Sequence, residues 1–156
     1  LCALLNPSVN SYRRLKPGSF SIGFSGWGND NIFAAVSIDA VYDTIDLNTL
    51  DCTANPYLAL GAAICAGLDG LGKAMKLPLP LTINPLEMSE DECFSAGVER
   101  LPANLNEALT ELETDLVLMK ALGAELANAY IVIKTSEALA QEGDPAYEFL
   151  LHRQRY

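Results

Sequence analysis

Residues 54–75, with the sequence ANPYLALGAAICAGLDGLGKAM, carry the strongest structural signal in the chain, because they predict one long helix. Asn55 is a suitable N-cap, since its side chain can accept a hydrogen bond from a free backbone N–H group, and Pro56 suits the first helical position. The segment then continues for about five turns and is apolar on nearly every face. A helix of this kind is normally buried on several sides, which a chain of 156 residues can supply only with difficulty.

The residues before this helix have the pattern of strands. Residues 19–53 are rich in Ser, Gly, Asn, Ile, Val and aromatic residues, and the segment YDTIDLN (residues 42–48) alternates between apolar and polar side chains. We therefore expect two or three antiparallel strands between about Ser11 and Leu47, packed beneath the long helix.

The residues after the helix have the pattern of further helices. A Pro-rich connector, KLPLPLTINPLEM (residues 76–88), precedes the segment SEDE, where Ser89 and Glu92 form a capping-box pattern. Amphipathic segments then predict two or three helices after Pro102 and a last short helix at residues 147–156. The predicted class is α+β, with strand-rich residues 1–53 followed by helical residues 54–156, and the length favours one domain.

Composition excludes several classes of protein. The formal net charge is −10, from 20 Asp and Glu against 10 Lys and Arg, so the phosphates of a nucleic acid would be repelled. The longest apolar stretch, at residues 57–68, is too short to span a bilayer, so we expect no membrane association. Four cysteines without CxxC spacing and a single histidine indicate neither a zinc site nor a disulfide framework, which favours a cytoplasmic protein. Because the chain begins at Leu1 and its first methionine is Met75, we expect it to be the C-terminal part of a longer protein.

The segment NPSVNSYRRLKPG (residues 6–18) is unusual in so acidic a chain. Two prolines and a glycine bracket a polar run that contains the adjacent arginines Arg13 and Arg14. Such a pair requires an anionic ligand or a structural partner within the protein. The residues alone leave both possibilities open.

Three motifs, in this order and spacing, resemble the C-terminal part of the glutamine synthetase catalytic domain. They are NPSVNSYRRLKPGSF, WGNDN with Trp27, and DCTANPYLALGAAICAGLDGL. The resemblance continues through the connector, RLPANLNEALTELETDLVLMKALG and the terminal LHRQRY, so it covers essentially the whole chain. Within the family, the KPGSF turn and the LHRQRY ending look most similar to glutamine synthetase-like proteins of the plant nodulin and fungal sporulation type, or to γ-glutamylpolyamine synthetases.

The resemblance implies an ATP-dependent ligase. ATP phosphorylates the side-chain carboxylate of glutamate, and ammonia or an amine displaces the phosphate, with Mg²⁺ or Mn²⁺ as the cofactor and a homo-oligomeric ring as the assembly. Arg14 corresponds to the family's active-site arginine, so it is our candidate catalytic and substrate- or nucleotide-binding residue. Trp27 is a second candidate, near the adenine, although its context between glycines favours a buried aromatic in a turn. Asp46 matches a metal-binding glutamate, or it is a solvent-facing strand residue.

Six positions depart from the family pattern, and one of them is Asp46, which stands where the family has a glutamate. Ile32, Ser37 and Asn48 stand where arginine or lysine is expected, and Ser19 and Phe20 stand where ammonia-using members have a glutamate on a flap. Two functions remain open. The chain is part of a glutamate–amine ligase, inactive by itself, or it is a catalytically dead homologue that serves as a structural or oligomer-forming module.

Overall fold

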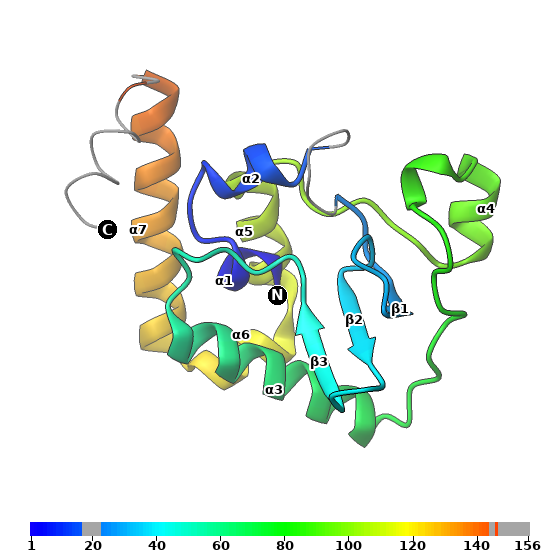
Figure 1. The fold of residues 1–156 in the computed structure, drawn as a ribbon. Coiled ribbons are helices and arrows are strands. Elements are labelled where there is room, and N and C mark those ends of the chain that lie inside the picture. Colours follow the sequence, from blue (N-terminus) through cyan, green and yellow to red (C-terminus); the bar gives the residue numbers. More distant parts are fainter. Residues whose placement is uncertain (17–22, 144–145, 147–156) are drawn as a thin grey trace.

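The computed structural model describes residues 1–16, 23–143 and 146 (Figure 1). Short helices open the chain, a small sheet follows, and helices make up the remainder. In chain order the elements are α1 (Cys2–Leu5), α2 (Ser11–Arg14), β1 (Trp27–Asn29), β2 (Val36–Asp39), β3 (Thr44–Leu47), α3 (Pro56–Gly72), the 3₁₀ helix η1 (Pro85–Glu87), α4 (Glu90–Ser95), α5 (Leu105–Thr114), α6 (Leu116–Leu122) and α7 (Ala124–Gly143).

The chain is α+β as predicted, but the segment Ser11–Arg14 is a helix and not part of a strand. A local hydrogen bond explains the difference. The backbone N–H of Ser11 donates to both the carbonyl and the hydroxyl of Ser8, at 3.1 Å and 3.2 Å, and this turns the chain into a helical conformation.

The sheet has the order β1-β2-β3, and only one of its two pairings is antiparallel as predicted. Strands β2 and β3 form an antiparallel pair, with Ser37 opposite Asp46. Strand β1 instead runs parallel to β2, with Trp27 opposite Val36. Parallel strands usually need a connection of a dozen or more residues. Here β1 is only three residues long, so the six residues 30–35 are enough to return the chain to its starting level.

The main core is helical and lies beside the sheet. Helix α3 packs on α1 and α6, not on the strands, so the expectation that the strands lie beneath it was wrong. Helix α1 also packs on α5, and α7 covers α5 and α6 (Figure 1). The hydroxyl of Tyr130 in α7 donates to the carbonyl of Ala3 at 2.7 Å, which joins α7 to α1. The largest fully buried apolar side chains are Leu4, Leu105, Leu112 and Leu118.

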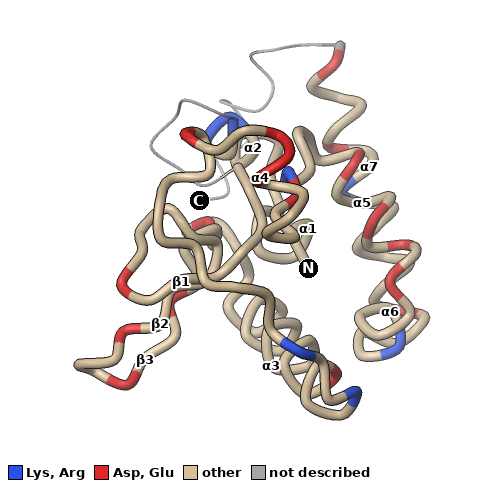
Figure 2. Tube along the Cα trace, turned by 90° about the vertical axis from the view of Figure 1, so that its right-hand side faces the viewer, with Lys and Arg blue, Asp and Glu red and all other residues tan. Residues whose placement is uncertain are grey.

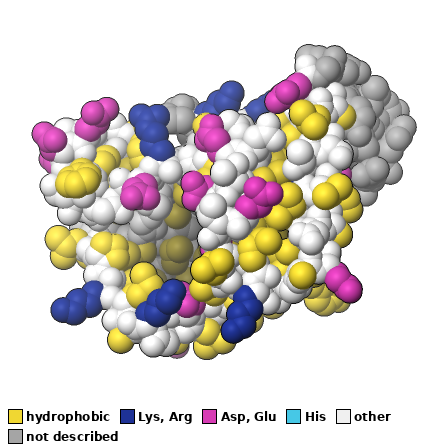
Figure 3. Space-filling view, turned by 180° about the vertical axis from the view of Figure 1, so that it is seen from behind, with side chains coloured by type: hydrophobic (Ala, Val, Ile, Leu, Met, Phe, Trp, Pro, Cys, Tyr) yellow, Lys and Arg dark blue, Asp and Glu magenta, His cyan; other side chains and the backbone are white. Residues whose placement is uncertain are grey.

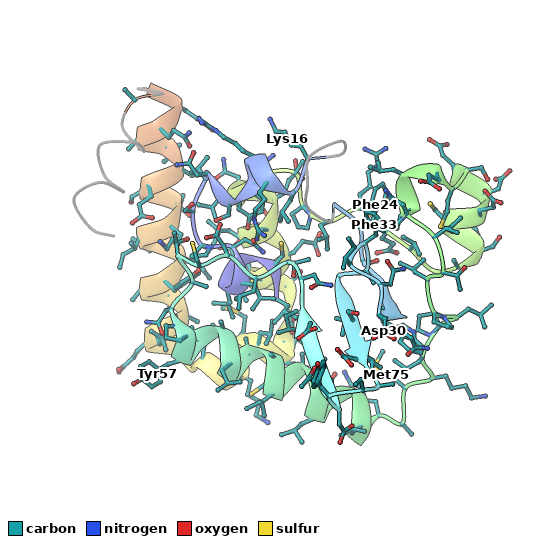
Figure 4. All side chains as sticks on the ribbon, in the orientation of Figure 1. Lys16, Phe24, Asp30, Phe33, Tyr57 and Met75 are labelled. Atoms are coloured by element: carbon teal, nitrogen blue, oxygen red, sulfur yellow. The ribbon has the colours of Figure 1, made fainter. Side chains whose placement is uncertain are left out.

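A second, smaller core lies between the sheet and the connector. Phe24, Ala34, Leu81 and Val98 are buried together there. The glycine at position 26 has φ +131°, and a Cβ built on it would lie 2.6 Å from Cδ1 of Leu81. The connector therefore passes directly over the start of β1, where the backbone N–H of Leu81 donates to the carbonyl of Trp27. Figure 4 labels Phe24, a member of this core.

The predicted helix starts are confirmed at two caps. The side chain of Asn55 accepts hydrogen bonds from the backbone N–H groups of Tyr57 and Leu58 at the start of α3. Ser89 and Glu92 form both halves of the capping box at the start of α4. Helix α3 ends at Gly72, somewhat earlier than expected. The predicted last helix at residues 147–156 lies outside the described residues, as do Ser19 and Phe20.

Among the described residues, no single helix is long and apolar enough to cross a membrane, although the pair α6 and α7, bent by 106°, passes the same test of length and composition. The four cysteines are free thiols, as expected from their spacing. Seen from behind, the surface shows hydrophobic side chains interspersed with charged ones (Figure 3).

Candidate functional site

Arg14 is half-buried at the end of α2, and its guanidinium is directed to the loop between β3 and α3. One terminal nitrogen, Nη2, donates to the carbonyl oxygens of Thr49 at 2.8 Å and Leu50 at 3.0 Å. The same nitrogen lies 3.5 Å from Oδ1 of Asn6. The neighbouring Arg13 is exposed on the same short helix. The structure thus gives the arginine of the polar segment a partner within the chain, more than thirty residues away.

Two further residues complete the contact between the start of the chain and this loop. Asn6 is fully buried, and its Nδ2 donates to the carbonyl of Cys2 at 3.4 Å. The carboxylate of Asp51 accepts hydrogen bonds from the backbone N–H and the hydroxyl of Thr53, at 2.9 Å and 3.0 Å. Arg14, Asn6 and Asp51 therefore form a polar cluster that fixes the loop just before α3, and we call these three residues the loop latch.

The pKa of Asp51 reports the balance of forces in the loop latch. Partial burial would by itself raise the pKa of this carboxyl. Hydrogen bonds from the backbone of Thr53 and from the hydroxyls of Ser11 and Thr53, together with the positive charge of Arg14, outweigh the burial. The net result is a lowered pKa, so the Asp51 carboxylate stays ionised to a lower pH than an ordinary carboxyl group.

Asp46 lies in the middle of β3, and its side chain is exposed. It stands directly opposite Ser37, which in turn is opposite Gly28 of β1. These three residues form one row across the sheet, and Trp27 belongs to the adjacent row. Because successive residues of a strand point to opposite faces, the side chains of Trp27 and Asp46 lie on opposite faces of the sheet. Within the described part of the chain, no hydrogen bond or ion pair is recorded for the Asp46 carboxylate.

Trp27 is half-buried, and its indole Nε1 donates to the carbonyl of Pro78 at 2.9 Å. The side chain thus ties β1 to the connector. An open groove of about 510 Å³ lies between the β1–β2 loop and the connector, lined by residues that include Phe33, Leu81 and Asn84 but not Trp27. The described residues that line this groove include no Lys or Arg.

Comparison with known proteins identifies the family. Residues 1–149 match the family model described as "Glutamine synthetase, catalytic domain". The chain belongs to this family. The glutamine synthetase of Methanocaldococcus jannaschii is 44% identical over 140 residues, which cover 88% of this chain and 31% of that protein. Gamma-glutamylpolyamine synthetase GlnA3 of Streptomyces coelicolor is 38% identical over 150 residues, which cover 92% of this chain and 32% of that protein.

Solved structures with a similar fold agree with the sequence match. "Apo GmaS without ligand" has a TM-score of 0.76 at 34% identity, covering 92% of this chain and 32% of that chain. "Crystal structure of novel glutamine synthase homolog" has a TM-score of 0.70 at 27% identity, covering 97% and 34%. The chain therefore spans about a third of the length of the relatives it matches.

At two positions where the glutamine synthetase family is expected to carry a cation, the side chain of this protein makes a local hydrogen bond. The Asn48 side chain donates to the carbonyl of Ala34 at 3.0 Å, and its backbone N–H donates to that of Ala35. The hydroxyl of Ser37 is buried and accepts from the backbone N–H of Asn31 at 3.1 Å. Ile32, in contrast, is 73% exposed. Polar groups at positions 37 and 48 thus shape the β1–β2 loop.

The metal ligands expected from the family cannot all come from the described residues. No group of three or more His, Cys, Asp or Glu residues suitable for a metal ion occurs among them. Magnesium prefers six oxygen ligands, several of which are usually waters or substrate phosphates. Asp46 therefore fits at most one ligand position of such an ion.

Sequence reasoning missed Asn6 and Asp51. The sequence offered one signal, because the polar run that contains Arg14 also contains Asn6. It offered none for Asp51, whose connection to Arg14 depends on how residues far apart in the chain fold together. Arg14, Trp27 and Asp46 remain candidate site residues.

Proposed function

We propose that this chain is part of an ATP-dependent ligase that joins glutamate to ammonia or an amine through γ-glutamyl phosphate. One observation carries the proposal. The match to the glutamine synthetase catalytic domain runs through residues 1–149, so it includes Arg14, Trp27 and Asp46. Because the chain spans about a third of its relatives' length, the remaining active-site groups would have to come from outside these 156 residues.

In this reaction ATP supplies the phosphoryl group, and a divalent cation, Mg²⁺ or Mn²⁺, neutralises the charge of the phosphates. Within this chain, Asp46 is the proposed oxygen ligand, because it stands where the resemblance places the family's metal-binding glutamate and its side chain is exposed. Arg14 donates a hydrogen bond to the carbonyl of Thr49, three residues after Asp46. We propose that Arg14 contributes to the site both through this support and through its positive charge.

We further propose that an amine larger than ammonia is the favoured acceptor. Ammonia-using members of the family place a glutamate on the flap where this sequence has Ser19 and Phe20. The similarity to a protein named gamma-glutamylpolyamine synthetase supports this choice. We also propose a homo-oligomer and a cytoplasmic location for the complete protein, by analogy with the family.

A second candidate function is a catalytically dead homologue that serves as a structural or oligomer-forming module. The observation that favours it is the replacement of three expected cations by Ile32, Ser37 and Asn48. Negative charge develops on the transferring phosphoryl group, and the loss of one such contact typically lowers the rate by roughly 10²-fold or more. The losses act on one site and therefore do not simply add.

The deciding experiment is an assay of the complete protein for glutamate-dependent phosphate release, with ammonia and with a series of amines. We expect turnover with ammonia to be barely above background and higher turnover with at least one amine. Asp46→Asn should abolish the amine-dependent turnover, whereas Asp43→Asn, an exposed position at φ +53° that asparagine tolerates, should not. Robust turnover with ammonia would show that the positions of the three missing cations are wrongly aligned. No turnover with any acceptor would favour the structural module.

A further inference from the structure

Helix α4 lies at one edge of the molecule, away from α5 and α7 (Figure 1). The apolar side chains in and around it do not all enter the small core. Val98 is buried there, whereas Phe94 in α4 is 87% exposed and Leu86 in η1 is 46% exposed. Apolar side chains that are open to water within a charged surface indicate a contact with another molecule.

An apolar groove of about 260 Å³ lies between η1, α4 and Phe24. Its lining includes Leu86, Met88 and Phe94, so it connects the exposed apolar side chains to the small core. The lining also contains Arg100, whose guanidinium carbon lies 5.5 Å from the centroid of the Phe24 ring. This cation is therefore engaged with an aromatic ring. We call this feature the α4 groove.

The surroundings of the α4 groove are acidic. Residues 85–100 contain five Asp or Glu residues against Arg100 as the one cation, and Figure 2 shows acidic residues in red along α4. Glu92 is used within the helix, because its carboxylate closes the capping box. No ion pair is recorded for Glu90 or Asp91 within the described part of the chain, and Glu90 lines the groove. The α4 groove thus combines apolar contact with negative charge around it.

We propose that the α4 groove binds a basic segment of a partner protein. The segment places a leucine or phenylalanine side chain in the groove and lysine or arginine side chains beside the carboxylates, because complementary charge selects the partner. A second copy of this chain is a poorer occupant, since it carries the same acidic surface and the same formal net charge of −10. The phosphates of a nucleic acid or of an anionic membrane would be repelled for the same reason.

The residues of α4 have the character of an outer surface of the complete protein. Every residue of this helix except Cys93 is exposed. Covering the helix with another part of the same chain would remove the carboxylates of Glu90 and Asp91 from water, which is unfavourable for charges without partners. We therefore expect α4 and its groove to remain accessible when the rest of the chain is present.

The test measures binding of a synthetic peptide to the complete protein by fluorescence anisotropy. The peptide has about 12 residues, with leucine or phenylalanine every three or four positions and lysine at the others, so that its helical form has one apolar and one basic face. A control peptide has glutamate in place of each lysine. We expect the basic peptide alone to bind. Equal binding of both peptides, or no binding of the basic peptide at about 1 mM, would overturn the proposal.

Two pairs of variants locate the binding site. Phe94→Ser should weaken binding of the basic peptide by about tenfold or more, whereas Leu79→Ser, at a 79% exposed residue outside the groove lining, should change it by less than about twofold. Glu90→Gln should weaken binding at low salt and have a smaller effect at high salt, while Glu113→Gln at an exposed position of α5 should have little effect at either. Equal effects within either pair would show that the peptide binds elsewhere.

Two further measurements on Phe94→Ser separate a partner protein from other occupants. A fall of more than about 3 °C in the melting temperature of the complete protein would show that this side chain is buried against the same chain, and the proposal would be wrong. A lower mass of the assembly would show that a second copy covers the groove, which would also overturn it. An unchanged mass with a smaller change in melting temperature supports the proposal. None of these readouts is a turnover, so the result is independent of the proposed ligase function.

Discussion

Replacement of Arg14 by methionine should destabilise the protein, because it removes the cation of the loop latch and keeps the hydrocarbon part of the side chain. The guanidinium donates to two carbonyl oxygens at 2.8 Å and 3.0 Å. A hydrogen bond that involves a charged group contributes about 1.5–3 kcal/mol. The acceptor on Thr49 belongs to a buried residue, whereas Leu50 is partly exposed and water can replace its partner.

The full contribution therefore applies to the hydrogen bond to Thr49, and a smaller one applies to the hydrogen bond to Leu50. Together they give a loss of about 2–3 kcal/mol in the free energy of unfolding. For a chain of this size the free energy of unfolding falls by about 2 kcal/mol per molar urea, so the urea concentration at the unfolding midpoint should fall by roughly 1–1.5 M. The assay is urea unfolding followed by circular dichroism and tryptophan fluorescence, since Trp27 is the only tryptophan.

Arg13→Met is the matched control, because Arg13 is the adjacent residue of the same helix and is exposed. We expect a change within about 0.5 kcal/mol for this variant, as for most surface substitutions. Arg14→Lys should fall between the two, because lysine keeps the charge but not the forked donor geometry. Equal midpoints for Arg14→Met and Arg13→Met would refute the loop latch and would indicate that Arg14 acts on a ligand alone.

Three further predictions concern single residues. The pKa of Asp51 is lowered in the folded protein, so this carboxylate stabilises the fold above the ordinary carboxyl pKa. The stabilisation is lost as the pH falls through the lower pKa of the folded state. Asp51→Asn should therefore make the free energy of unfolding, measured by urea unfolding between pH 7 and pH 2, depend less on pH. Ser89→Ala removes the capping box and should cost α4 about 1 kcal/mol, seen as faster amide hydrogen exchange, while Ser95→Ala should leave the cap intact. Gly26→Ala should destabilise by about 2 kcal/mol or more, because φ is +131° and the new Cβ would meet Leu81, and an unchanged melting temperature would contradict this.

Local chemistry made part of the fold predictable from the sequence. Asn55 and Ser89 cap helices through atoms that lie within three residues of them, so their sequence context contains the whole interaction. The same reasoning failed at Ser11–Arg14. There the side chain of Ser8 favours a helical turn, and the alternation expected of a strand is too short to compete.

Long-range contacts were beyond the reach of pattern and propensity. The parallel pairing of β1 and β2 depends on a six-residue return, and strand patterns do not encode direction. The partner of Arg14 lies 35 residues away in a loop without regular structure. The apolar character of α3 predicts burial on several sides, but Leu60, Ile64 and Leu68 are exposed in this structure.

The environment of Asn48 shows why the missing cations are not isolated substitutions. Its side chain donates to the carbonyl of Ala34 and so supports the loop that carries Ile32. An arginine at position 48 would either lose the hydrogen bond to this carbonyl or use its guanidinium to make it. In either case the loop would change when the charge was introduced. The same holds for Ser37, whose buried hydroxyl accepts a hydrogen bond from Asn31 in a space where a longer side chain would displace the loop. Restoring the family's cationic positions would therefore require the β1–β2 loop to change together with them, and single substitutions at positions 37 and 48 should destabilise the protein before they restore any phosphate contact.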